Sequence, residues 1–380
     1  MPPKAKNIMN KKLLITALSV CCIALTVNGR TVNVRSFGAK GDGQVCTEAL
    51  NKTIKAAKDG DTVLIPEGRY VTGTVHLKSH ITLIIEKGAE ILGTENLKAY
   101  DHYKPEKPMT RYDTGKGTVN ANIANDEEWT KALLLDERIE DVRICGEGTI
   151  NGRHIENKAG EEGMRGPHAM LFAESQNIHI DEINVTCAGN YAFMGYELSN
   201  VVFKSVRITE GWDGIHIRGG RNITIKECDI MTGDDAIAGG YWENMRITGC
   251  RLNSACNGIR MIEPSRDLFI EDCHIYGPGK YAHRTSREEK RTASIYGIVL
   301  EPGAWGDAPG HTENIHITNV TIDNVLSPLV YSMGSDNTCS GLYIDGLHAT
   351  HIKHNTLPLN WQGGSGMWND INIKDLTIKD

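Results

Sequence analysis

The sequence is poor in aromatic residues and in long apolar runs. Aromatic side chains make up 6% of the 380 residues, and past residue 27 no apolar stretch approaches membrane-spanning length. The formal net charge of −7 argues against a body that binds nucleic acid. No Cys-x-x-Cys motif or His/Cys cluster is evident, so the sequence predicts no metal site and no cofactor.

The N-terminal segment has the pattern of an export signal. Four lysines precede an apolar run from Leu13 to Val27, which is too short to span a bilayer comfortably. We expect a signal peptide over residues 1–29, cleaved after Gly29, and a protein released into the periplasm or secreted. A retained membrane anchor is the alternative.

What the sequence has in place of apolar runs is a short repeat. One alternating pattern recurs about every 22 residues, anchored at Asn177, Asn200, Asn222, Asn244 and Asp267. A period this short, combined with strand-like alternation, is typical of a β-solenoid. We therefore predict an all-β fold, a right-handed parallel β-helix that forms a single catalytic domain over residues 30–380.

The repeat has a predicted cap and two predicted interruptions. Residues 48–58 have the apolar spacing of a short helix, which would cover the exposed edge of the first strand. Residues 97–130 and 278–311 lack the alternation. Long loops on a rigid scaffold usually wall a binding site, and we expect the same of these two.

Three cysteines share one repeat position. Cys228, Cys250 and Cys273 each lie six residues after an anchor, which predicts a stack of small side chains inside the coil. Side chains on adjacent parallel strands point the same way, an orientation that is poor for a disulfide. We expect free, packed thiols there.

A polar stripe follows from the same count. The residues thirteen positions past successive anchors are Asn190, Asp213, Asp235, Asn257 and Lys280. Ile215, Ile237 and Ile259 would stack inward, so the alternating residues between them point outward. The repeat period and the inward–outward alternation along each strand together predict one outward cluster. Its members are Asp213, Asp234, Asp235, His216, Asn257 and Arg260.

Carboxylates crowded in this way raise one another's pKa. A protonated acid beside ionised neighbours is the arrangement that glycoside hydrolysis needs, and with room for an attacking water the reaction inverts the anomeric centre. The alternative is a structural ladder of acidic turn residues, which might also bind calcium.

The motifs around these acids resemble those of glycoside hydrolase family 28, the polygalacturonases. Gly211-Trp-Asp-Gly214 stands for the family's Asn-Thr-Asp-Gly, and Gly233-Asp-Asp235 matches its Gly-Asp-Asp one coil later. The segments 37–43 and 66–70 are also similar to the family. The resemblance implies that Asp234 is the general acid and that Asp213 and Asp235 hold and deprotonate the attacking water.

The chain departs from the family in two places. Asn257 stands where Gly-His-Gly has its histidine, and the segment Gly297–Glu301 stands where Arg-Ile-Lys would be. The missing cations hold the galacturonate carboxylate in the family, which puts plain polygalacturonan in doubt as the substrate. The candidates for replacement charge are Arg260, the best placed, with Lys280, His283 and Arg284.

Several other residues are candidates for substrate contact, and each of them could instead have a purely structural role. Arg260 and His216 would contact substrate or be ordinary surface residues, and Trp212 would form a sugar-stacking wall or a packed turn. Trp129 and Trp242 are weaker candidates of the same kind.

The sequence thus predicts an exported, inverting glycoside hydrolase that acts on an acidic, galacturonate-containing plant-wall polysaccharide or its oligosaccharides. The two long loops favour exo action. A polysaccharide lyase or epimerase on the same architecture, with a Lys or Arg base and often calcium, stays open. So does a non-catalytic carbohydrate-binding solenoid. The sequence leaves the oligomeric state undetermined.

Overall fold

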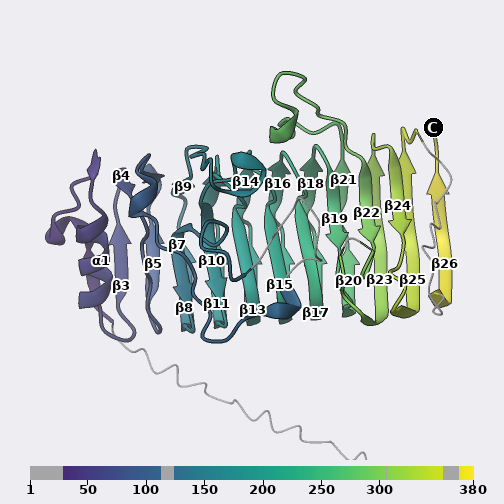
Figure 1. Ribbon diagram of the computed structural model, residues 1–380, viewed down its shortest axis with the longest axis horizontal. Helices are drawn as coiled ribbons and strands as arrows, with labels where there is room; N and C mark the ends of the chain where they lie inside the picture. Colours follow the sequence, from purple (N-terminus) through teal and green to yellow (C-terminus); the bar gives the residue numbers. More distant parts are fainter. Residues whose placement is uncertain (1–28, 113–123, 305, 354–367) are drawn as a thin grey trace, which may run out of the picture.

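A computed structural model describes residues 29–112, 124–304, 306–353 and 368–380. Its strands wind into one elongated coil, with helix α1 (Thr47–Ala56) at one end and strand β26 (Trp368–Ile378) at the other (Figure 1). The named strands pair in parallel throughout the described ranges, so the predicted right-handed parallel β-helix with an N-terminal capping helix is confirmed. The expected signal peptide covers residues 1–29, of which residues 1–28 lie outside the described residues.

The strands line up in three ladders along the axis. The first holds β1 (Thr31–Asn33), β3 (Thr62–Ile65), β5 (Thr82–Ile85), β8 (Glu140–Cys145), β11 (Gln176–Asp181) and β20 (Arg266–Glu271). The second holds β2 (Asp42–Val45), β4 (Gly68–Thr72), β6 (Ala89–Gly93), β9 (Thr149–Asn151), β12 (Asn184–Thr186), β14 (Arg207–Thr209), β16 (Asp229–Thr232), β18 (Arg251–Ser254) and β21 (His274–Tyr276). The third holds β7 (Ala132–Glu137), β10 (His168–Ala173), β19 (Asn257–Met261), β22 (Tyr296–Leu300) and β24 (Ser327–Tyr331).

Longer strands bend from one ladder into the next. Those that join the third ladder to the first are β13 (Phe193–Lys204), β15 (Ile215–Lys226) and β17 (Ile237–Thr248). Those that join the first to the second are β23 (Gly310–Asp323), β25 (Asn337–Thr350) and β26. The short 3-10 helices are η1 (Val34–Phe37), η2 (Leu97–Ala99), η3 (Thr110–Tyr112), η4 (Glu161–Gly163) and η5 (Arg284–Ser286). Within the described ranges, no helix is both long and apolar enough to cross a membrane.

The repeat anchors form a ladder of amides at one corner of the coil. The side-chain amide of Asn222 donates to Asn200 Oδ1 at 2.9 Å, and Asn244 donates to Asn222 Oδ1 at 2.8 Å. Each of these residues has a left-handed backbone, with φ between 54° and 55°. Asparagine tolerates this conformation better than most residues, and its amide satisfies the neighbour one coil away. The 22-residue period therefore has a physical cause at this corner, where each asparagine meets its equivalent in the next coil.

The interior is a set of aligned apolar rows. Ile215, Ile237 and Ile259 pair in register and are fully buried. The thiols of Cys250 and Cys273 are buried as well, and each donates to a main-chain carbonyl of the preceding coil. None of the eight described cysteines is disulfide-bonded, so the expected stack of free thiols is confirmed.

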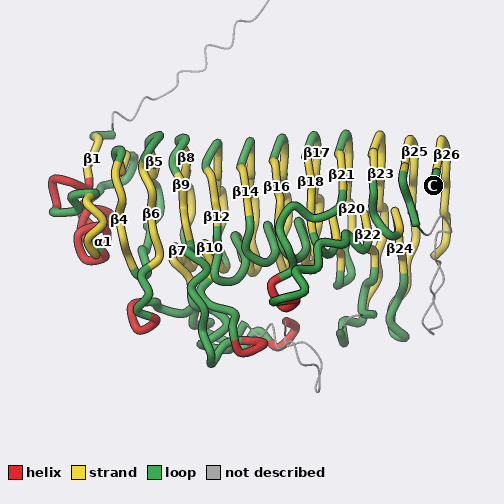
Figure 2. The backbone as a smooth tube through the Cα atoms, turned by 90° about the horizontal axis from the view of Figure 1, so that it is seen from above, coloured by secondary structure: helices red, strands yellow, loops and turns green. Residues whose placement is uncertain are grey.

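One outward row of the third ladder changes character along the axis. Its register runs through Leu135, Leu171, Met194, His216, Ala238 and Arg260. The first three are apolar and belong to a second buried cluster, whereas the last three line the site described below, to which His216 and Arg260 bring polar side chains. The longer connections gather along one side of the coil (Figure 2).

The segment before β7 covers the apolar part of that row. Tyr103, Tyr112 and Trp129 are all buried in the second cluster, and the indole of Trp129 donates to the hydroxyl of Tyr196 at 3.0 Å. The predicted loop over 97–130 therefore packs on the sheet through large apolar rings rather than standing free of it. Residues 113–123 of this loop lie outside the described residues.

The second predicted loop is shorter than expected. Within 278–311, strand β22 restores the coil, because Tyr296 pairs with Asn257 in the third ladder. Tyr296, and not Lys280, is therefore the next member of the polar stripe. The count of thirteen fails here because residues 277–295 leave the coil as an insertion between β21 and β22.

Candidate active site

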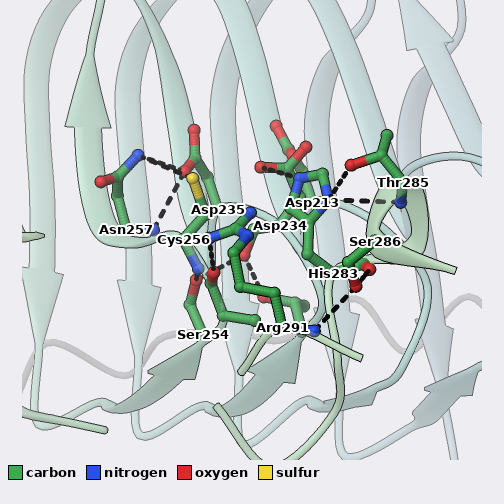
Figure 3. Close-up of polar contacts among 12 residues, drawn as sticks. Asp213, Asp234, Asp235, Ser254, Cys256, Asn257, His283, Thr285, Ser286 and Arg291 are labelled. Carbon is green, nitrogen blue, oxygen red and sulfur yellow. Dashed lines mark hydrogen bonds and ion pairs between the residues drawn. The ribbon is translucent and has the colours of Figure 1, made fainter. Parts of the chain in front are cut away.

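The three aspartates sit on turns that lead into the third ladder. Asp213 lies between β14 and β15, and Asp234 and Asp235 occupy the equivalent turn between β16 and β17. A main-chain bond from Gly214 N to Asp235 O, 2.9 Å long, fixes the two turns side by side. Figure 3 shows the three carboxylates together, faced by the segment that carries His283. The repeat period and the inward–outward alternation thus predicted the cluster that the fold assembles.

An arginine that the sequence reasoning missed holds Asp234. Arg165 follows η4 in the connection from β9 to β10, and its Nη2 lies 3.5 Å from Asp234 Oδ2. Its guanidinium also stacks over Trp212, 3.8 Å from the ring centroid. The side chain is 5% exposed, so this cation acts at low local dielectric, where its field is strong.

His283 approaches Asp234 from the inserted segment. Its Nε2 lies 3.5 Å from Asp234 Oδ1, while its Nδ1 accepts a hydrogen bond from the backbone N–H of Thr285 at 3.3 Å. Because Nδ1 is the acceptor, the ring proton sits on Nε2 and points at the carboxylate. His283, predicted for substrate charge, is therefore a partner of the predicted acid.

His216 holds Asp213 from within the ladder. Its Nδ1 lies 2.7 Å from Asp213 Oδ2, and its ring stacks on Tyr191 at 4.8 Å between centroids. Both His216 and Asp213 are 3% exposed. Burial lowers the pKa of His216 to about 3, so the ring is neutral at ordinary pH. His216 orients the carboxyl and is too deeply buried to be a surface residue.

Asn257 and Arg260 hold Asp235. The amide of Asn257 donates to Asp235 Oδ1 at 2.6 Å, and Arg260 Nη1 lies 3.6 Å from Asp235 Oδ2. Arg260 also forms an ion pair with Glu301, which stands where the resemblance expects a cation. The predicted Arg260 is thus at the site, with its charge shared between two carboxylates.

The protonation of the cluster is uneven. Burial, followed by the charge of Asp234, raises the pKa of Asp235 to about 8 and that of Asp213 well above its usual range. Burial would also raise the pKa of Asp234, but the hydrogen bond from His283 and the charge of Arg165 outweigh it and hold that pKa well below its usual range. The resting site therefore combines an ionised Asp234 with protons held by its two neighbours.

The acids border a small cavity. Its volume is about 40 Å³, room for one or two water molecules, and its lining includes Glu161, Arg165, Tyr191 and Arg260 as well as the three aspartates. Asp234 is the most exposed of the three, with 14% of its side chain accessible against 4% and 5% for Asp213 and Asp235. The cavity thus reaches solvent past Asp234.

Glu161 is a second residue that the sequence reasoning missed. Both of its carboxylate oxygens are buried and have no hydrogen-bond partner among the described residues. Burial, only partly offset by Arg165, raises its pKa to about 7. Glu161 and Arg165 come from the connection 152–167, which breaks the repeat pattern, and that break is the signal that could have drawn attention to them.

Other predicted candidates lie away from the cavity. Trp212 is fully buried and its indole donates to Gly189 O at 3.0 Å, which favours the packed turn over the sugar-stacking wall. Trp129 and Trp242 are buried too. Trp129 belongs to the 97–130 segment and packs in the second cluster, and Trp242 packs in the main core. Lys280 is exposed, and Arg284 pairs with Glu156 at 3.2 Å.

Comparisons with known proteins identify the family of this chain. The family described as rhamnogalacturonase A/epimerase, pectate lyase-like, matches residues 31–277. An exo-poly-alpha-D-galacturonosidase of Dickeya chrysanthemi is 26% identical over 251 residues, which are 55% of this chain and 41% of that protein. The chain therefore spans less than half the length of that relative.

Two solved structures share the fold. A polygalacturonase from Erwinia carotovora ssp. carotovora aligns over 91% of this chain and 96% of its own, with a TM-score of 0.58 and 16% identity. A family 28 exopolygalacturonase of Yersinia enterocolitica covers 92% of this chain and 79% of its own, with a TM-score of 0.56 and 17% identity. The chain belongs to the rhamnogalacturonase A/epimerase, pectate lyase-like family, as a divergent polygalacturonase-like member.

Proposed function

We propose that the protein is a glycoside hydrolase that cleaves galacturonate-containing pectic saccharides with inversion at the anomeric carbon. The observation that carries the proposal is the meeting of the three carboxylates of Asp213, Asp234 and Asp235 around a water-sized cavity. An inverting hydrolase needs one acid for the leaving oxygen and one base for water, held on opposite sides of the reacting carbon. Asp213 and Asp235 hold the water, and Asp234, the carboxyl nearest the solvent, meets the glycosidic oxygen.

Asp234 must gain a proton before it can act as the acid. Arg165 and His283 keep it ionised in the free protein. A bound galacturonate carboxylate would compete for the Arg165 guanidinium and the His283 Nε2–H group and weaken their hold on Asp234. The pKa of Asp234 would then rise, and a proton from the Asp213/Asp235 pair could pass to it. An anionic substrate would thus prepare its own general acid.

Glu161 is proposed to accept hydrogen bonds from sugar hydroxyls. Its two buried oxygens lack partners among the described residues and border the cavity. A buried acceptor without a partner is costly, and a hydroxyl donor of the substrate would satisfy it. This residue would contribute binding and orientation, with the chemistry left to the three aspartates.

Exo action is proposed from the way the cleft is closed. The outward row of the third ladder borders the cavity at His216 and Arg260 but is covered at Leu171 and Met194 by the segment before β7. A polymer chain lying along this face would be stopped at the covered coils. Chain ends, rather than internal linkages, would then reach Asp234.

The test is product analysis with defined pectic oligosaccharides, galacturonan and rhamnogalacturonan fragments included. The expected result is release of short products from one chain end. NMR should show that the first anomer formed is opposite in configuration to the cleaved linkage. Rapid viscosity loss with few reducing ends would exclude exo action, and an initial product of unchanged configuration would exclude inversion. Export is tested by locating the full-length chain in cell fractions.

The rival activities give different outcomes in the same assay. A lyase or epimerase would yield an ultraviolet-absorbing unsaturated product or an isomerised sugar, and chelation would stop a calcium-dependent one. In the free protein the cations Arg165 and Arg260 lie close to Asp234 and Asp235, which disfavours calcium there. Glycan binding with no turnover on any substrate would identify a carbohydrate-binding solenoid.

A further inference from the structure

Three side chains with nitrogen, sulfur and oxygen donors meet on one edge of the second ladder. Cys187 and Glu210 directly follow β12 and β14, and His154 lies three residues past the end of β9. One donor atom from each lies within 4.8 Å of the other two. All three residues have a left-handed backbone, with φ of 52°, 52° and 64° for His154, Cys187 and Glu210. They project from equivalent corners of three successive coils.

The main chain holds these corners in place. His154 N donates to Cys187 O at 2.6 Å, and Cys187 N donates to Thr209 O at 3.2 Å. Each donor-bearing corner is thus tied to the coil that follows it. A site built on such a scaffold needs only small side-chain movements to close around a ligand.

The side-chain contacts fit a metal site without a bound ion. His154 Nε2 lies 2.7 Å from Glu210 Oε2, and His154 Nδ1 is buried without a partner among the described residues. Zinc takes imidazole nitrogen and carboxylate oxygen at about 2.0–2.2 Å and thiolate sulfur at about 2.3 Å. Tetrahedral ligands at those lengths stand roughly 3.3–3.8 Å apart, so closure around the ion needs shifts of an ångström or less.

We propose that His154, Cys187 and Glu210 bind a zinc ion, with the fourth position left to water. Two protein charges, from the thiolate and the carboxylate, would balance the dication. Arg284 is a cation in the neighbourhood, but it pairs with Glu156 at 3.2 Å. The side chains of His154 and Glu210 are both 35% exposed, so an ion can enter from solvent.

Two other groups of potential ligands are weaker. Asp234, Asp235 and Cys256 lie close together, but Arg165 and Arg260 already supply positive charge to the two carboxylates. His80, Glu140 and Asp141 form an exposed surface group with no sulfur ligand. The mixed donor set that zinc favours occurs, among the described residues, at the His154 group.

Zinc at this position would cross-link three coils beside the active site. Glu210 is three residues before Asp213, with Gly211 and Trp212 between them. The ion would stabilise the folded state in proportion to its occupancy. This inference does not depend on the proposed hydrolase activity, because its readouts are metal affinity, spectrum and melting temperature.

The experiment uses the untagged full chain, stripped with a chelator and titrated with zinc alone by calorimetry. We expect one equivalent to bind with a Kd below about 10 μM, and Cys187→Ser and Glu210→Gln each to weaken binding at least about tenfold. Cobalt provides a second probe, since a thiolate ligand gives a sulfur-to-metal charge-transfer band. That band should appear in the wild type and be absent in Cys187→Ser.

The matched controls are Cys256→Ser and His80→Gln, which alter the two competing groups. Both should bind zinc as the wild type does, and zinc should raise the melting temperature of these variants but not of Cys187→Ser. The proposal fails if the wild type shows no saturable binding, or if Cys187→Ser keeps the affinity and the cobalt band. Loss of binding in either control would place the ion elsewhere and overturn it equally.

Discussion

The guanidinium of Arg165 lies over the indole of Trp212, 3.8 Å from the ring centroid. Neither side chain has appreciable contact with solvent. A cation stacked on a buried aromatic face is held in one place, and here that place is 3.5 Å from Asp234. Trp212, predicted as a possible wall for sugar, instead positions the cation beside Asp234, the proposed acid.

Replacing Asp234 by Asn should abolish most of the turnover. Loss of a general acid typically costs about 10²–10⁴-fold in rate. We expect a fall in kcat of that order and a lower melting temperature, because the buried guanidinium of Arg165 loses its ion pair with Asp234. The matched control is Asp229→Asn on the same coil, a partly exposed carboxylate that should retain full activity. Full activity in Asp234→Asn would move the acid to another residue.

Replacing Arg165 by Gln should change the pH profile as well as the rate. Arg165 helps hold the pKa of Asp234 below its usual range, so its loss should raise that pKa. The pH profile of kcat/KM should then shift to higher pH, and KM for anionic oligosaccharides should rise. Arg153→Gln, which alters an exposed cation on the same connection, should leave both unchanged. An unshifted profile in Arg165→Gln would contradict the proposed control of the acid.

Asp235 should make the protein less stable as the pH rises. Its pKa is about 8 in the folded protein and about 3.9 in an unfolded chain. The folded state therefore binds the proton more tightly, and the stability this provides is complete below pH 4 and is lost as the pH rises towards 8. In Asp235→Asn the melting temperature should fall less over this window. A parallel decline in both proteins would show that other groups cause it.

The contribution of the amide ladder to the free energy of unfolding should divide into a backbone part and a hydrogen-bond part. Asn222→Ala loses the ladder bonds to Asn200 and from Asn244, and alanine tolerates a φ of 54° less well than asparagine, so it should cost about 1–2 kcal/mol of unfolding free energy or more. Asn222→Gly loses the same bonds but suits the left-handed backbone, and should cost less. Thr224→Ala, on the outward face of the same strand, is the control. Chemical denaturation measures all three, and equal losses for Ala and Gly would exclude a backbone contribution.

The sequence predicted the features that depend on the repeat. The anchor residues, the cysteine stack and the three aspartates all follow from a 22-residue period and from the alternation of strand residues. Each prediction applies the same short repeat again from a new anchor, so an error in one coil does not shift the residues predicted in the next. The position of His216 beside Asp213 follows from the same rules.

Features that depend on insertions could not be obtained in this way. Lys280 was assigned to the stripe because the count ignored the inserted residues 277–295, and β22 restores the register only at Tyr296. Arg165 and Glu161 reach the cavity from a connection whose path has no periodic rule. The group of proposed zinc ligands could not be predicted from the sequence, because its members are 33 and 23 positions apart along the chain and become neighbours only through coiling.

The distance between Asp213 and its partners one coil later has an unusual origin. It is set by main-chain hydrogen bonds between neighbouring turns, such as that from Gly214 N to Asp235 O, rather than by the packing of a unique core. The separation of strands in a sheet is among the least variable lengths in proteins, about 4.8 Å. The spacing of Asp213 from Asp234 and Asp235 is thus fixed by the regular separation of paired strands. Whole coils could be added or removed at the far ends of the molecule while the acids kept their separation, provided that these two rungs stayed adjacent.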